Sequence, residues 1–127
     1  MLKVMKEQKI VGVVNVWNEV DQKFHPDLTT VEDNDHTVND YVMCGEEYLL
    51  RDDPRAIEYE ENRVRDIRNS YLEQYVDPVC SNPLRWADMS EEEKQVYIDY
   101  RRYLLDFTTQ TDWYKLTPMT LDEWKNQ

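Results

Sequence analysis

Residues 63–75 read RVRDIRNSYLEQY and residues 90–107 read SEEEKQVYIDYRRYLLDF, and these two stretches decide the fold. In the second stretch, large apolar and aromatic side chains recur at gaps of four, three and four residues: Val96, Tyr100, Tyr103 and Phe107. This spacing places them on one face of an amphipathic α-helix. A connection containing Pro78 and Pro83 joins the two stretches. The sequence therefore predicts a small antiparallel helical hairpin whose inward side is rich in tyrosine.

Signals for helix ends flank both stretches. Residues 52–54 (Asp-Asp-Pro) predict a helix start, because acidic caps and a proline in the first turn suit a helix N-terminus. The step Asp77-Pro78 predicts the end of this helix, since a residue before proline is disfavoured in the helical region. Ser90 and Glu93 have the spacing of a capping box and predict the start of the second helix.

The first fifty residues have the composition of strands and turns. Residues 9–17 (KIVGVVNVW) are β-branched and aromatic, which is typical of a strand. Polar residues follow, and we expect a hairpin whose second strand lies at residues 23–26. Residues 29–40 are polar and acidic and are predicted to form a loop. Residues 41–50 are expected to be extended, with a helical turn as the alternative.

These elements predict an α+β fold with two regions. Residues 1–51 would form a small extended or β-hairpin region, and residues 52–127 a helical hairpin. A short closing segment follows the hairpin, marked by a second capping box at Thr120 and Glu123. At 127 residues the chain has room for one small domain with an appendage, and a partner or homo-oligomer would add to its stability.

The chain is strongly acidic, with 27 acidic and 15 basic residues and a net charge of −12. Such a charge disfavours binding to nucleic acids and to anionic membranes. It favours solubility, a basic partner, or mimicry of a DNA phosphate array. No apolar run approaches a membrane span, and the N-terminus has no signal-peptide pattern, so we expect a cytoplasmic protein. Cys44 and Cys80 are expected to be buried or idle thiols in a reducing compartment.

Residues with catalytic or metal-binding chemistry form no known pattern in the sequence. His36 stands among Asp33, Asp35 and Asp40, which are possible ligands of a hard cation, but the spacing and glycine of an EF-hand are missing. We therefore expect a solvated acidic loop. Carboxylates at the helix starts are explained by their favourable interaction with the positive end of the helix dipole. The sequence predicts a protein without enzymatic activity, cofactor or metal.

Aromatic residues are the candidate binding residues, because there are more of them than a two-helix core needs. Two interpretations remain open: they pack the hairpin and attach the closing segment to it, or several of them form a binding face for another polypeptide. The residues predicted to bind a partner, including one arginine beside the rings, are Tyr71, Tyr75, Tyr97, Tyr100, Arg101, Tyr103, Trp113 and Trp124.

Two motifs resemble the phage tail assembly chaperone-like family. The first is R-x-x-R-N-x-x-L, which begins at Arg65 and ends at Leu72. The second is S-E-E-E-x-x-x-Y-x-x-Y-R-x-x-L-x-x-F, which begins at Ser90 and ends at Phe107. The family often has tryptophan where this chain has Tyr97. Its usual D-W step is displaced here to residues 84–86, and its Trp-Pro ending is absent.

The resemblance implies a small accessory protein of a phage or prophage that assists tail or tail-fibre assembly without nucleotide or metal. Its partner would be a structural tail or tail-fibre protein, and it would act in the cytoplasm of a bacterial host. A permanent tail or baseplate component, located in the virion, is one alternative. An acidic DNA mimic that inhibits a DNA-binding enzyme is the other.

Overall fold

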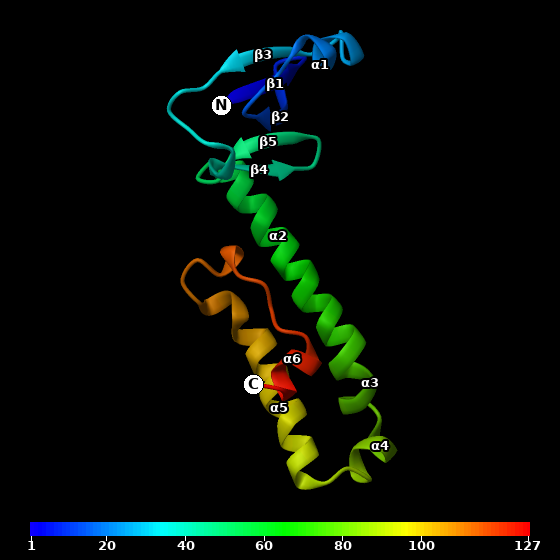
Figure 1. Ribbon diagram of the computed structural model, residues 1–127. Coiled ribbons are helices and arrows are strands. Elements are labelled where there is room, and N and C mark those ends of the chain that lie inside the picture. The colour runs from blue at the N-terminus through cyan, green and yellow to red at the C-terminus, as the bar shows by residue number, and fades with distance from the viewer. The chain divides into compact units, whose positions relative to one another are not determined.

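The computed structural model describes all residues, 1–127, and confirms the predicted α+β fold class. Two small antiparallel sheets come first in the chain, and most of the helices follow them (Figure 1). The chain divides into two compact units, Met1–Tyr59 and Glu60–Gln127. The boundary between these units falls within helix α2 (Pro54–Tyr71).

The first unit contains a three-stranded sheet in the order β2-β1-β3. Its strands are β1 (Leu2–Lys6), β2 (Lys9–Val14) and β3 (Thr29–Glu32). The central strand β1 pairs antiparallel with both neighbours, and its register to β2 shifts between Val4 and Met5. Val4 is buried and packs next to Gly12, where a Cβ atom would lie 3.4 Å from that of Val4.

The predicted hairpin between residues 9–17 and 23–26 is wrong. Strand β2 pairs instead with β1, through a tight turn at Glu7 and Gln8. The region expected to hold the second strand is helix α1 (Glu19–Phe24). Its start is a reciprocal cap: the Asn18 side chain accepts from the Asp21 N–H at 2.9 Å, and the Asp21 carboxylate accepts from the Asn18 N–H at 3.0 Å. This cap outweighs the weak strand preference of the segment.

A second hairpin of β4 (Tyr41–Cys44) and β5 (Glu47–Leu50) confirms the extended prediction for residues 41–50 and excludes the helical alternative. Gly45 begins its two-residue turn with a positive φ of 69°, which glycine adopts without strain. The segment 29–40 is not the continuous loop that the sequence predicts. It contains β3 and a 3-10 turn at Val38–Asp40.

The second unit is helical. Helix α2 continues through a π-helical segment, Leu72–Val76, into α3 (Asp77–Cys80). The other helices are α4 (Pro83–Ala87), α5 (Glu91–Asp106) and α6 (Leu121–Lys125). The residues expected to link the two hairpin helices thus include α4. Asn82 caps α4, and Ser90 caps α5 by accepting from the Glu93 N–H.

The prediction that Asp77-Pro78 ends the first helix is wrong, because helical structure reaches Cys80. The N–H of Asp77 donates to the carbonyl of Leu72, five residues earlier, as in a π-helix. Pro78 then stands in the first turn of α3, so no hydrogen bond within α3 requires its missing N–H. The widened turn is what allows the helix to pass the proline ring.

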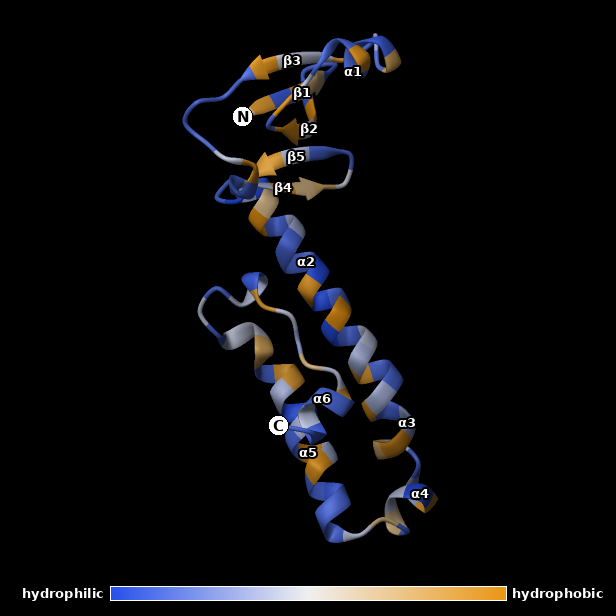
Figure 2. Ribbon diagram, viewed as in Figure 1, coloured by the Kyte–Doolittle hydropathy of each residue, from blue (hydrophilic) through white to orange (hydrophobic).

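The hairpin prediction itself is confirmed. Helix α5 runs back alongside the stretch from Leu72 to Cys80, and α6 lies against α5 (Figure 1). The core of this unit contains Val76, Tyr100, Leu104 and Leu121. Orange and blue segments alternate along α5, as expected for a helix with one buried face (Figure 2). No helix in the chain combines the length and apolar character that crossing a bilayer requires.

Candidate functional site

Three of the predicted binding residues form an aromatic cluster inside the second unit. Tyr100 is fully buried, and its ring centroid lies 6.1 Å from that of Tyr103 and 5.9 Å from that of Trp124. Tyr103 and Trp124 stack with centroids 4.8 Å apart and ring planes 24° apart. Most of the ring surface of these three residues is therefore used to pack α6 against α5.

The same tyrosines also bind the backbone before α6. The Tyr100 hydroxyl donates to the Met119 carbonyl oxygen at 2.8 Å, and the Met119 N–H donates to the Tyr103 hydroxyl at 2.9 Å. Burial raises the pKa of Tyr100 well above its ordinary value, so the phenol remains a donor at neutral pH. The interpretation that the rings attach the closing segment to the hairpin holds for Tyr100, Tyr103 and Trp124.

The other predicted aromatic residues are half-buried. Tyr71 and Tyr75 lie with their centroids 5.4 Å apart and pack against the core, and burial raises the pKa of Tyr71. The Arg65 guanidinium lies 5.1 Å from the centroid of the Trp113 ring, a cation–π geometry. Among the eight predicted binding residues, Arg101 alone is exposed.

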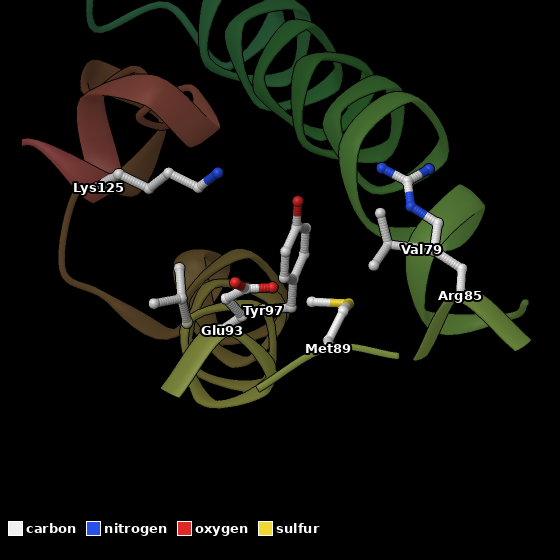
Figure 3. Close-up of a pocket in the computed structure, with 7 residues that line it drawn as sticks. Val79, Arg85, Met89, Glu93, Tyr97 and Lys125 are labelled. Atoms are coloured by element: carbon white, nitrogen blue, oxygen red, sulfur yellow. The ribbon is translucent and has the colours of Figure 1, made fainter. Parts of the chain in front are cut away.

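Tyr97 lines a cavity of about 440 Å³ on one side of α5. Its ring stands between Lys125 and the pair Val79 and Arg85 (Figure 3). The Lys125 ammonium lies 5.5 Å from the ring centroid. Met89 and Glu93 also line the cavity, so an aromatic ring, a thioether, a carboxylate and two cations meet at this site.

A second hollow, of about 330 Å³, lies between α4 and α5, and we call it the α4–α5 groove. It is lined by Cys80, Trp86, Ile98, Arg101, Arg102, Leu105 and Asp106. Ile98 and Leu105 are 42% and 41% exposed, and Leu84 on α4 is 80% exposed. Of these residues only Arg101 is among the predicted binding residues. The available signal was the seven-residue spacing of Ile98 and Leu105, which forms a second stripe on α5.

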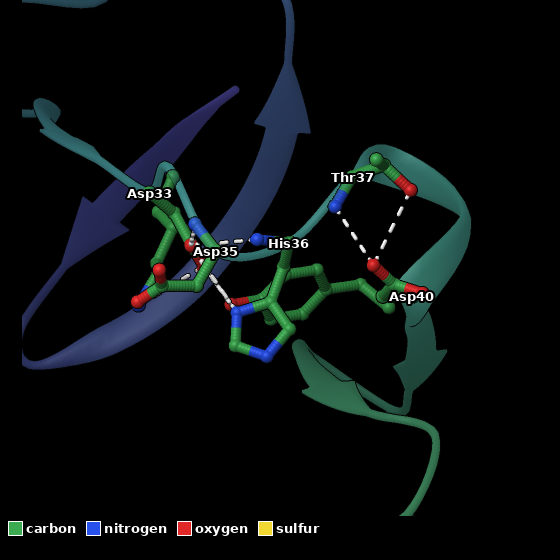
Figure 4. A network of polar contacts seen from close by, with 7 residues as sticks. Asp33, Asp35, His36, Thr37 and Asp40 are labelled. Atoms are coloured by element: carbon green, nitrogen blue, oxygen red, sulfur yellow. Dashed lines mark hydrogen bonds and ion pairs between the residues drawn. The ribbon is translucent and has the colours of Figure 1, made fainter.

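The first unit has a polar network around one buried carboxylate, Asp33 (Figure 4). Asp33 accepts hydrogen bonds from the Tyr41 hydroxyl at 2.7 Å and from the backbone N–H groups of Asp35 and His36 at 3.0 and 3.1 Å. Nδ1 of His36 lies 3.0 Å from the carboxylate, and the Lys3 ammonium lies 3.7 Å from it. The network joins the end of β3 to the start of β4.

The electrostatics of this network keep Asp33 ionised. The Tyr41 hydrogen bond is the main reason why the pKa of Asp33 lies far below its ordinary value. Burial and the neighbouring carboxylate raise the pKa of Tyr41 to about 12. The expectation of a fully solvated acidic loop is thus wrong for Asp33. Asp40 instead accepts from the Thr37 N–H at 2.8 Å, and no three His, Cys, Asp or Glu side chains are arranged to hold a metal ion.

No protein-family model, no curated protein and no solved structure matches the chain. The resemblance to tail assembly chaperones stays a prediction that rests on the motif residues between Arg65 and Phe107. The surface features of the second unit are independent of it. They consist of the α4–α5 groove, the Tyr97 cavity and the exposed apolar side chains beside them.

Proposed function

We propose that the chain is an accessory protein that binds another polypeptide non-covalently through its second unit. The observation that carries this proposal is the exposed apolar surface of α5, where Ile98 and Leu105 line the α4–α5 groove and are 42% and 41% exposed. Apolar side chains gathered at a hollow and bordered by charge are typical of protein interaction sites.

The partner we propose is a structural tail or tail-fibre protein of a phage or prophage. This part of the proposal is supported by the resemblance of the two helical motifs. A fibre subunit exposes strand edges and apolar surface until it assembles, and such surfaces aggregate. An accessory chain that covers them reversibly would raise the yield of assembled fibre.

The charge of the chain suits this role. A net charge of −12 keeps a complex with an aggregation-prone partner in solution. Some carboxylates are paired with arginines on the surface, for example Glu60 with Arg63 and Glu61 with Arg65, both on α2. A regular exposed array of unpaired carboxylates, which a DNA mimic requires, is less compatible with such pairs.

Co-expression tests the proposal. The tail-fibre protein of the same phage or prophage is produced with and without this chain, and its soluble fraction and co-purification are measured. We expect more soluble fibre protein and a complex that survives purification. Unchanged solubility together with no complex would overturn the proposal. Mass spectrometry of purified phage particles distinguishes an assembly chaperone from a permanent tail component. A chaperone is absent from the particles, and a structural component is present in them.

A further inference from the structure

We propose that the α4–α5 groove binds an amphipathic helix of the partner that carries carboxylates beside its apolar face. This inference rests on the proposed function, since it names the surface and the chemistry by which the partner is held. The groove is a different surface from most of the tyrosines that the sequence predicted as binding residues, because those tyrosines pack within the second unit.

The apolar part of the groove has the dimensions of a helix contact. Ile98 and Leu105 are seven residues apart on α5, so they lie two turns, or about 10 Å, from each other along the helix axis. Trp86 of α4 also lines the groove. An apolar row of this length, from Ile98 to Leu105, can contact the side chains at positions i, i+3 or i+4, and i+7 of a docked helix. Its hollow of about 330 Å³ has room for a few such side chains.

The secondary structure around the groove favours a helix over a strand as the ligand. The longer wall is α5, a sixteen-residue helix whose backbone groups are mostly satisfied by intrahelical hydrogen bonds, and the other is the single helical turn of α4. Neither wall is a strand edge, so the groove offers no extended row of N–H and C=O groups to which an added strand could bond. Recognition must therefore come from side chains, as it does when a helix lies in a groove.

Two arginines specify the charge of the ligand. Arg101 and Arg102 line the groove, and neither guanidinium forms an ion pair, although acidic residues outnumber basic ones by 27 to 15. Arg63 and Arg65 on α2, in contrast, are both paired with glutamates. Even Asp106, one turn from Arg102, forms no ion pair with it. The two guanidinium groups thus remain free to bind the carboxylates of a ligand.

The net negative charge of the chain does not prevent this binding. At physiological ionic strength charges are screened beyond about 8 Å, so a carboxylate in the groove responds mainly to the arginines beside it. Asp106 is the one acidic residue that lines the groove, against two arginines. The local charge therefore favours an acidic ligand, while the rest of the surface disfavours non-specific binding of acidic chains.

Two designed peptides provide the test. Both are labelled, about 18 residues long so that they can form a helix, and have leucine at the same i, i+3, i+4, i+7 positions. One has glutamate at the flanking positions and the other has lysine. Fluorescence anisotropy with the full chain should show the glutamate peptide binding at least about tenfold more tightly. In Arg101→Glu/Arg102→Glu this preference should reverse, and in Lys9→Glu/Lys23→Glu, a control with the same change in net charge, it should persist.

Equal affinity for the two peptides, or a preference that Arg101→Glu/Arg102→Glu leaves unchanged, would overturn the inference. Its failure is distinguishable from failure of the proposed function. If the wild-type chain keeps the fibre protein soluble and Ile98→Ser/Leu105→Ser does so equally well, the groove is not the binding site but the function stands. If the wild-type chain has no effect on the fibre protein, the proposed function fails, and the peptides still decide whether the groove binds acidic helices.

Discussion

The hydroxyl of Tyr100 and the carbonyl oxygen of Met119 are joined by a 2.8 Å hydrogen bond that spans nineteen residues of sequence. Together with the bond from the Met119 N–H to Tyr103, it holds both backbone polar groups of Met119. This contact explains why the segment before α6, which has little regular structure, has a defined position against α5. It also explains why tyrosine, and not phenylalanine, stands at positions 100 and 103.

Tyr100→Phe and Tyr103→Phe should each lower the free energy of unfolding by about 1 kcal/mol, because each removes one hydrogen bond and keeps the ring. The amide of Met119 should lose protection from hydrogen exchange in Tyr103→Phe. Tyr59→Phe, at a position that is 42% exposed, is the control and should change stability by less than about 0.5 kcal/mol. Equal effects of all three substitutions would contradict the role of the Met119 bonds.

Leu104 and Leu105 are neighbours with opposite environments. Leu104 is fully buried in the core of the second unit, and Leu105 is 41% exposed in the α4–α5 groove. Leu104→Ala should cost about 2–5 kcal/mol of stability, the usual range for a buried leucine. Leu105→Ala should cost less than about 1 kcal/mol and instead weaken binding of the acidic peptide. Urea denaturation measures the loss of stability, and fluorescence anisotropy measures the loss of peptide binding. A larger loss of stability in Leu105→Ala than in Leu104→Ala would contradict the orientation of α5.

Substitutions in the two hairpin turns of the first unit should change its stability in opposite directions. Glu7 and Gln8 have positive φ values of 51° and 68°, a conformation that asparagine and glycine adopt more readily. Glu7→Asn/Gln8→Gly should therefore stabilise the β1–β2 hairpin by about 1 kcal/mol. Gly45→Ala should destabilise the β4–β5 hairpin by a similar amount, because of strain at φ 69° rather than a steric clash. Amide exchange in each hairpin reports these changes.

The Asp33–Tyr41 hydrogen bond should make the first unit sensitive to alkaline pH. The pKa of Tyr41 is raised to about 12 from 10.0. The stabilisation that the Tyr41 hydrogen bond gives the folded unit is therefore complete below pH 10 and is lost as the pH rises through 12. Tyr41→Phe should cost about 1–3 kcal/mol at neutral pH, since it removes a donor from a buried carboxylate. It should also abolish this alkaline loss. Amide exchange in β4 at several pH values measures both effects.

The same bond predicts a response to acid. The pKa of Asp33 is lowered, so its stabilising effect is present above the ordinary carboxyl pKa of about 3.9 and declines as the pH falls below that value. Tyr41→Phe removes the main cause of the lowered pKa, and Asp33 should then titrate at a higher pH. Carboxyl chemical shifts of Asp33 in the two proteins provide the measurement. An unchanged titration curve would contradict the assignment.

Strong local signals made the helical half predictable. The 3.6-residue spacing in α5 and the Ser90 and Thr120 caps were sufficient to place α5 and α6 from the sequence. Pro78 misled the prediction because a π-helical turn, which has no clear sequence signature, carries the helix past it. The β1–β2 hairpin was missed because Glu7 and Gln8 lack the asparagine or glycine that usually marks such a turn.

The proposed binding surface was harder to predict because periodicity does not say which stripe of a helix is covered. Helix α5 has two apolar stripes, one through Tyr100 and Leu104 and one through Ile98 and Leu105. The sequence left two roles open for the tyrosines, and the structure packs Tyr100 and Tyr103 against Trp124 of α6. The Leu72–Val76 segment and α6 together cover the stripe through Tyr100 and Leu104 and leave the other stripe exposed.

Site-specific photo-crosslinking tests the proposed binding surface most directly. A photoreactive amino acid replaces Ile98 in the α4–α5 groove or, as the control, Ser70 on an exposed part of α2, in cells that also produce the tail-fibre protein. We predict a covalent adduct with the fibre protein from position 98 and little or none from position 70. Equal yields at the two positions, or no adduct at position 98, would contradict the account.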